Sequence, residues 1–147
     1  MSYFYELQTG VRQGGVLSPF LFSIFIDDLV KYINKANIGC RIGASCTAIF
    51  LYGDDVILLA PSVQALQSLV DICASELEFL HMAINVGKSA CMRFGPRFKN
   101  ACADIVVSVH SIKWEMSARY FGVYLENSTK FKCSFSKKKQ SGIFKVF

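Results

Sequence analysis

The chain has 147 residues, of which 52% are hydrophobic and 18% are charged, and its formal net charge is +5. This hydrophobic content is enough for the core of one small domain and excludes a disordered chain. No apolar run approaches the roughly 18–20 residues that span a bilayer, so no membrane contact is expected. The modest positive charge favours anionic partners without identifying one.

Two further global features concern the cell compartment and the cysteines. The first residues lack the basic and then apolar segments of a signal peptide, so we expect an intracellular protein, cytoplasmic or nuclear. The six cysteines include no Cys-x-x-Cys pair. Free and mostly buried thiols are therefore expected, rather than disulfides or a zinc site. His81 and His110 are isolated in sequence, and we interpret both as structural.

The first part of the chain predicts a strand, a glycine loop and a helix. Residues 3–9 are short and rich in aromatic side chains, which is typical of a strand. A loop with closely spaced glycines follows, and its backbone could approach a ligand. Ser18 as N-cap and Pro19 as first helical residue then predict a helix that ends near Asn37.

Asp27 and Asp28 form an acidic pair inside this predicted helix. Successive helical residues point about 100° apart, so the two carboxylates cannot grip one metal ion together. We interpret the pair as solvated or as making a capping contact.

The central stretch, residues 48–60, has two apolar runs around Tyr52-Gly53-Asp54-Asp55. Such runs, broken by Gly-Asp, predict a β-hairpin with Gly53 in the turn and with strands buried on both sides. Asp54 and Asp55 would lie together at its tip, and no basic residue of this stretch neutralises them. The pair favours Mg²⁺ or Mn²⁺ bound through oxygen ligands, although an isolated Asp-Asp is more simply a polar turn.

The second half predicts another helix and several strands. Pro61-Ser62 begins a helix that continues to about His81 with an apolar stripe along one face. Strands are predicted over residues 90–94, 103–114 and 120–125, the last with a glycine kink or bulge. The order of elements predicts an α+β fold, with a mainly antiparallel sheet and helices packed on one face.

The turn before residue 90 contains Gly87-Lys88-Ser89, which matches the end of a phosphate-binding P-loop. The earlier glycine that a P-loop requires is absent, because position 82 is Met82. A P-loop is therefore excluded.

Four segments in this order resemble the palm of a reverse transcriptase from non-LTR (LINE-like) retrotransposons. They are Gly-Val-Arg-Gln-Gly-Gly-Val-Leu-Ser-Pro at 10–19, Tyr-Gly-Asp-Asp at 52–55, Asn-Val-Gly-Lys-Ser at 85–89 and Tyr-Phe-Gly-Val-Tyr-Leu at 120–125. The first two together, at this separation, are the strongest evidence. The resemblance implies a polymerase palm-like fold, with a partial palm over residues 1–126 and a basic tail over 127–147 that could begin a thumb or linker. Fingers and thumb would be largely missing.

The resemblance also implies an RNA-directed DNA polymerase that uses an RNA template, a DNA primer and deoxynucleoside triphosphates. Two divalent ions about 3.5–4 Å apart would stabilise the attacking and leaving oxygens. Asp54 would be the principal metal ligand and Asp55 the supporting one. The other implied contacts are with the nascent base pair by Arg12 and Gln13, with substrate by Gly14, with the primer terminus by Tyr52 and with the triphosphate by Lys88. Residues 120–125 resemble the primer-grip hairpin, in which Phe121 and Gly122 would support the primer strand. The oligomeric state is not predicted.

Two departures from the family pattern leave alternatives open. Gly53 replaces the more usual alanine, and glycine is also common there in viral RNA-dependent RNA polymerases. The family's palm begins with a strand that supplies a further metal-binding aspartate, whereas the one acidic residue before Gly10 is Glu6. We therefore expect a fragment that is inactive alone. The alternatives are a non-catalytic nucleic-acid-binding remnant and a fragment of a viral RNA polymerase.

Overall fold

The structure is a computed structural model of the chain, and it describes residues 18–97 and 99–134. The predicted strand at 3–9 and most of the glycine loop lie outside the described residues. In chain order the elements are α1 (Ser18–Phe25), α2 (Asp27–Ala36), β1 (Cys40–Ile42), β2 (Ser45–Thr47), β3 (Ile49–Tyr52), β4 (Asp55–Leu58), α3 (Val63–Phe79), the 3₁₀ turn η1 (Val86–Lys88), β5 (Ala90–Cys91), β6 (Ile105–Val107), β7 (His110–Trp114), β8 (Ser117–Tyr120), β9 (Val123–Glu126) and β10 (Lys132–Ser134).

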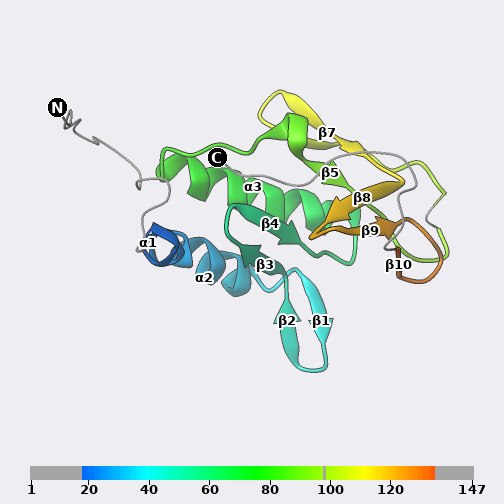
Figure 1. Cartoon of the computed structure of the whole chain (residues 1–147), viewed down its shortest axis with the longest axis horizontal. Helices are drawn as coiled ribbons and strands as arrows, with labels where there is room; N and C mark the ends of the chain where they lie inside the picture. The colour runs from blue at the N-terminus through cyan, green and yellow to red at the C-terminus, as the bar shows by residue number, and fades with distance from the viewer. Residues whose placement is uncertain (1–17, 98, 135–147) are drawn as a thin grey trace.

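The mixture of helices and antiparallel strands agrees with the predicted α+β class (Figure 1). The strands do not form one sheet, however. β1–β2 and β3–β4 are separate two-stranded ribbons, β9 lies between β8 and β10, and β7 lies between β5 and β6. Among the described strands, the β5–β7 pair is parallel and the other pairs are antiparallel. A two-stranded ribbon is marginally stable by itself, so the stability of β3–β4 depends on packing against α2 and α3.

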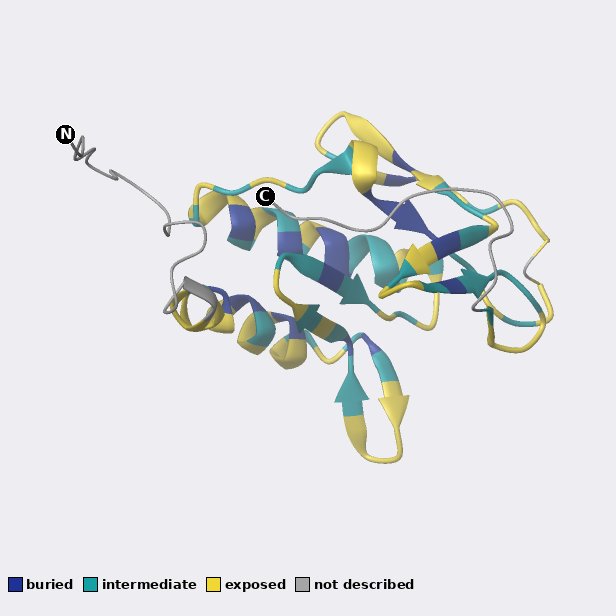
Figure 2. Ribbon diagram, in the orientation of Figure 1, coloured by how far each residue is buried: buried dark blue, intermediate teal, exposed yellow. Residues whose placement is uncertain are grey.

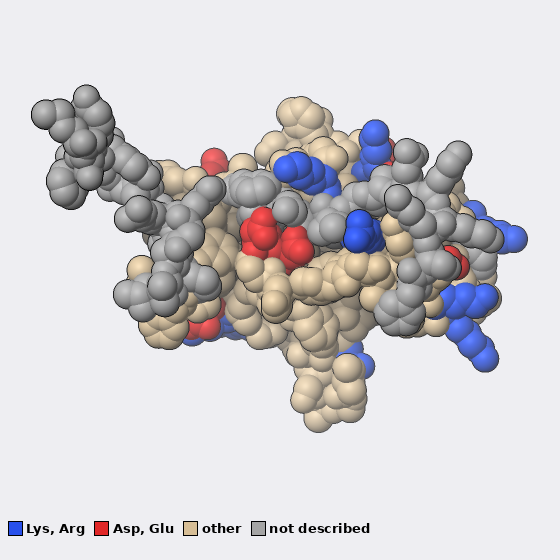
Figure 3. All heavy atoms as spheres, viewed as in Figure 1, with Lys and Arg blue, Asp and Glu red and all other residues tan. Residues whose placement is uncertain are grey.

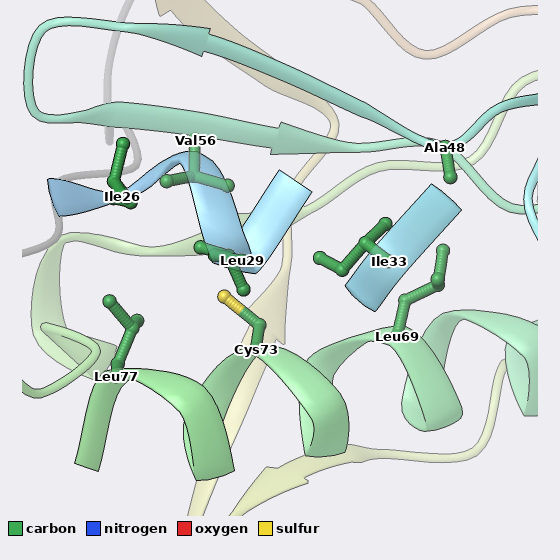
Figure 4. Packing of buried hydrophobic residues seen from close by; sticks show 8 residues of the cluster. All are labelled: Ile26, Leu29, Ile33, Ala48, Val56, Leu69, Cys73 and Leu77. Atoms are coloured by element: carbon green, nitrogen blue, oxygen red, sulfur yellow. The ribbon is translucent and has the colours of Figure 1, made fainter. Parts of the chain in front are cut away.

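A first core lies between α2, α3 and the β3–β4 ribbon, and Figure 4 shows its side chains converging from these elements. Leu29 and Ile33 of α2 and Leu69 and Leu77 of α3 have no measurable exposure. Val56 of β4 is buried against the same cluster. Burying a side chain of this size contributes about 1.5–3 kcal/mol, so this cluster fixes the ribbon on the helices.

A second core lies on another side of α3. Val70 of α3 packs with Cys91 of β5, Ile105 of β6 and Ile112 of β7. The Gln67 side chain adds polar contacts, because its amide accepts from the Val106 N–H and donates to the Val106 carbonyl, both at 2.8 Å. Helix α3 therefore contributes side chains to both hydrophobic cores.

The helix boundaries agree only in part with the sequence. Ser62 caps α3 as predicted, because its side chain accepts from the Ala65 N–H at 3.1 Å. Asn37 ends α2 with φ of 55°. The single helix predicted before it is wrong, since α1 and α2 are separated at Ile26, whose side chain is buried in the first core. In the described part of the chain, no helix has both the length and the apolar character to cross a membrane.

Two turns without a strong sequence signal divide predicted strands. Residues 103–114 form the β6–β7 hairpin, which turns at Ser108 with φ of 55°. Residues 120–125 form the end of β8, a turn and most of β9. The single strands predicted from the residue pattern of these two segments are therefore wrong, whereas the β8–β9 hairpin agrees with the hairpin that the resemblance implies at 120–125. The strand at 90–94 is reduced to β5.

Two pairings were not predicted at all. The β1–β2 hairpin extends away from the rest of the molecule (Figure 1), and its turn end is exposed (Figure 2). β10 pairs with β9 and lies within the segment 127–147 that the sequence assigns to a tail. The domain boundary at 126 stays a prediction.

The six cysteines are free thiols, as predicted, but they are not mostly buried. Cys73 and Cys91 are buried, whereas Cys133 is exposed and the other three are intermediate. Burial raises the pKa of the Cys73 thiol to about 12, and burial followed by the charge of Cys102 raises that of Cys91 to about 12.

We expect Gly39→Ala to destabilise the protein. Gly39 is buried beside Ala48, and an added Cβ would lie 2.5 Å from the Ala48 Cα, which is backbone and cannot rotate away. Overpacking of this kind costs about 1–3 kcal/mol. The free energy of unfolding in urea measures it. Gly87→Ala is the matched control, because its nearest neighbour would be 3.6 Å away; equal effects of the two variants would contradict the packing described here.

We also expect stability to fall at alkaline pH through Cys73. Its pKa is raised in the folded protein from 9.0 to about 12. The folded state therefore favours the neutral thiol, so this contribution is complete below pH 9 and is lost as the pH rises towards 12. The free energy of unfolding between these pH values should decline less steeply in Cys73→Val. Cys133→Ser should keep the original slope, and identical slopes in all three proteins would refute the assignment.

Candidate active site

The β3–β4 hairpin forms as predicted and turns at Gly53–Asp54. Tyr52 and Asp55 pair across the strands, leaving a two-residue loop. Gly53 has φ of 57°, which suits the first position of a type II′ turn. The prediction that both faces are buried is wrong: Phe50 is 48% exposed and Tyr52 66% exposed. One face of the ribbon packs on the helices, while the other carries aromatic side chains outward.

The two carboxylates of this turn form a compact acidic site. Asp54 and Asp55 are half-buried, and the Oδ1 atom of Asp55 is buried. Figure 3 shows two neighbouring acidic side chains near the middle of one face, over the β3–β4 turn, with Lys and Arg side chains above and to the right of them. Oxygen ligands of this type fit Mg²⁺ or Mn²⁺, which proteins commonly hold through one or two carboxylates together with substrate phosphates and water.

The site needs more ligands than these two residues. Within residues 18–97 and 99–134, no group of three or more His, Cys, Asp or Glu side chains could hold a metal ion. Any further oxygen ligands would come from substrate, water or residues that are not described.

The β8–β9 turn lies against the acidic hairpin. Phe121 and Gly122 form this two-residue turn with φ of 48° and 78°, the two positive values of a type I′ turn. The rings of Phe121 and Tyr52 are 4.5 Å apart at an interplanar angle of 86°. This edge-to-face arrangement is favourable for aromatic rings. The structure thus brings together Tyr52, Asp54, Asp55 and the Phe121–Gly122 turn.

Tyr120 is a neighbour of this site to which the sequence assigns no separate role. Its ring is 4.2 Å from that of Phe121. Burial first, and then the negative charges of Asp55 and Tyr52, raise the pKa of the Tyr120 hydroxyl. Its position next to Phe121 in the quoted motif is the signal that could have identified it.

Lys88 is the remaining predicted site residue that the structure describes. Lys88 lies in η1, where its N–H donates to the Asn85 side chain at 3.2 Å. Its predicted role near a triphosphate stays a prediction. Arg12, Gln13 and Gly14 lie outside the described residues.

Asp27 and Asp28 behave as the sequence predicts for a solvated pair. Lys31 forms ion pairs with both, at 2.8 and 3.0 Å, and all three side chains are well exposed. The Asp27 and Asp28 carboxylates raise the pKa of Lys31. An exposed pair that already has a cationic partner contributes little to stability and is not arranged as a metal site.

A hollow of the described surface is separate from the carboxylates. It is a cavity of about 730 Å³, lined mainly by apolar side chains that include Phe50, Ile57, Trp114 and Tyr120. Neither Asp54 nor Asp55 lines it. The candidate site is therefore identified by the charge and chemistry of its two carboxylates and not by this cavity.

The family described as "Reverse transcriptase (RNA-dependent DNA polymerase)" matches residues 2–125. The chain belongs to the reverse transcriptase family. The matched range contains the acidic turn and most of the β8–β9 hairpin. The four-segment resemblance noted in the sequence is therefore confirmed at the level of the family.

Two relatives of this reverse transcriptase chain align with most of its length. It is 25% identical to the Pol polyprotein of the type-2 retrotransposable element R2DM of Drosophila melanogaster, over 85% of the chain and 12% of that protein. It is 29% identical to the RNA-directed DNA polymerase from mobile element jockey of Drosophila funebris, over 86% of the chain and 14% of that protein. The chain thus spans a small part of these relatives. No solved structure matches it.

We expect Asp54→Asn to weaken Mn²⁺ binding by at least about tenfold. Opposite unit charges 4 Å apart attract by about 4 kcal/mol at an effective dielectric constant of 20, and each 1.4 kcal/mol is a factor of ten. Titration of the chain followed by Mn²⁺ electron paramagnetic resonance gives the affinity. Asp28→Asn is the matched control and should leave it unchanged, because Asp28 is paired with Lys31; equal losses in both variants would place the ion elsewhere.

Proposed function

We propose that this chain is the palm segment of an RNA-directed DNA polymerase of a non-LTR retrotransposon. The observation that carries the proposal is the half-buried carboxylate pair at the β3–β4 turn, set beside a second hairpin turn. The family match supports the activity, and the names of the R2DM and jockey relatives support the retrotransposon origin.

In this proposal Asp54 and Asp55 hold Mg²⁺ or Mn²⁺. When bound, the metal ion stabilises the charge that develops on the attacking and leaving oxygens during nucleotide transfer. The protein's own contribution is to hold both carboxylates at one rigid turn. Tyr52 pairs with Asp55 and exposes two-thirds of its surface, so it can border the primer terminus.

The proposed partners are an RNA template, a DNA primer and deoxynucleoside triphosphates. The net charge of +5 and the Lys and Arg side chains beside the acidic pair in Figure 3 favour a polyanionic ligand. In this scheme Arg12 and Gln13 contact the nascent base pair, Gly14 contacts substrate, and Lys88 lies near the triphosphate. Phe121 and Gly122 border the primer strand.

We further propose that the chain needs an additional segment to be active. Two carboxylates leave most of the coordination positions of a two-metal centre to other ligands, and the family's palm uses a further aspartate. A fragment that contains fingers and this first strand would supply it.

The test is primer extension on an oligo(dT)-primed RNA template with Mg²⁺ or Mn²⁺. The chain supplemented with a fingers-plus-first-strand fragment should incorporate deoxynucleotides. Asp54→Asn should lower the rate by at least about a hundredfold, because several kcal/mol of charge stabilisation are lost and each 1.36 kcal/mol is a factor of ten. Asp28→Asn should retain the rate. Activity of the unsupplemented chain would contradict the need for the additional segment.

Two other outcomes would replace the proposal. Salt-sensitive binding of RNA–DNA hybrids without incorporation in any mixture would leave a nucleic-acid-binding remnant. Preferential incorporation of ribonucleotides would indicate an RNA polymerase instead.

A further inference from the structure

The β8–β9 turn contains a large side chain in an unfavourable backbone conformation. Phe121 has φ of 48°, in the left-handed region that is costly for residues with a bulky side chain. Type I′ turns favour Asn, Asp or Gly at this position because these residues adopt positive φ more easily. Strain of this kind persists where surrounding contacts offset it, and such sites are often functional.

The contacts of the Phe121 ring identify what offsets the strain. The ring contacts two tyrosines, with centroid distances of 4.5 Å to Tyr52 and 4.2 Å to Tyr120. Phe121 is nevertheless 54% exposed, so burial in a core does not explain its presence. The contact of Phe121 with these two rings is therefore the interaction that offsets its backbone strain.

The turn that Phe121 contacts lies beyond the core. The last core side chain near the end of the ribbon is Val56, while Tyr52 and Asp55 follow at the turn as a cross-strand pair. A two-stranded ribbon is marginally stable by itself. A ring that holds Tyr52 restricts the backbone to which Asp55 is paired and, through the two-residue loop, that of Asp54.

We propose that Phe121 is a positioning residue that fixes the acidic β3–β4 turn by holding the Tyr52 ring. This role adds to its proposed place beside the primer, and its link to metal binding rests on the proposed function of Asp54 and Asp55. It differs from a primer contact, because it operates in the free protein.

The test uses Phe121→Asn in the full chain. Asparagine suits the turn, so the thermal unfolding midpoint should stay the same or rise. The tip should become mobile, so ¹⁵N relaxation should give lower order parameters for Gly53, Asp54 and Asp55. Mn²⁺ binding should weaken by about two- to tenfold, the range expected when one aromatic contact is lost.

Two variants serve as controls. Phe121→Tyr keeps a ring at the position and should restore both the order parameters and the Mn²⁺ affinity. Val109→Asn changes the turn of the β6–β7 hairpin, where Val109 is 87% exposed, and should alter neither quantity.

The outcomes separate this proposal from the function it builds on. Unchanged order parameters at the acidic turn in folded Phe121→Asn would overturn the proposal, even if primer affinity fell. A lower unfolding midpoint, with a general loss of order, would overturn it in favour of a merely structural role. If the unmodified chain binds no Mn²⁺, the proposed function fails, while lower order parameters confined to this turn would still support positioning by Phe121.

Discussion

The packing of α3 is the constraint on which the rest of the structure depends. Leu69 and Leu77 face α2 and the β3–β4 ribbon, whereas Val70 belongs to the cluster with β5, β6 and β7. A two-stranded ribbon such as β3–β4 is at best marginally stable alone, and the β5–β7–β6 sheet buries its apolar side chains against α3. By contributing to both clusters, one long helix fixes the ribbon that carries the carboxylates relative to the strands that lead to the β8–β9 hairpin.

At the candidate site, the β3–β4 ribbon and the β8–β9 hairpin meet through the contact between Tyr52 and Phe121. This contact joins a residue of the acidic ribbon to the turn of a later hairpin, and Tyr120 also contacts the Phe121 ring. The acidic turn is thus held from two directions. The core fixes its base through Val56, and the aromatic rings restrict its tip. Such double support suits the metal-binding role proposed for this turn, which would require precise placement of two charged side chains.

The sequence predicts those parts of the fold that local physical signals determine. Gly53-Asp54 between apolar runs predicts the acidic hairpin, and Ser62 before an apolar stripe predicts α3. The division at Ser108 is not predictable in this way, because Ser-Val is not a typical turn pair. The turn between β8 and β9 is not predictable either, because it contains Phe121 and a bulky aromatic residue is unusual where φ is positive.

The candidate site is predictable for a different reason and to a different extent. The carboxylate pair follows from local chemistry, and the family resemblance indicates the residues around it. The contact of Tyr52 with Phe121, and the position of Tyr120 beside it, depend on how two hairpins that are distant in sequence lie relative to each other. No periodicity or turn preference carries that information. Lys88 lies in η1, which is separated from the acidic hairpin along the chain. Its role near the triphosphate is therefore indicated by the family resemblance alone.

The distribution of backbone strain between the two turns supports different roles for them: the β3–β4 turn carries the charges, and the β8–β9 turn positions it. In the acidic turn the positive φ falls on Gly53, which adopts it without a steric penalty, and Asp54 is not among the described residues with positive φ. In the β8–β9 turn the strain falls on Phe121, although Gly122 follows it. Asp54 and Asp55, which carry the charge, therefore have no positive φ. The strained residue is Phe121, whose ring contacts Tyr52, the cross-strand partner of Asp55. A turn selected for folding alone would place a small residue at position 121, so the aromatic ring there is best explained by what it holds in place.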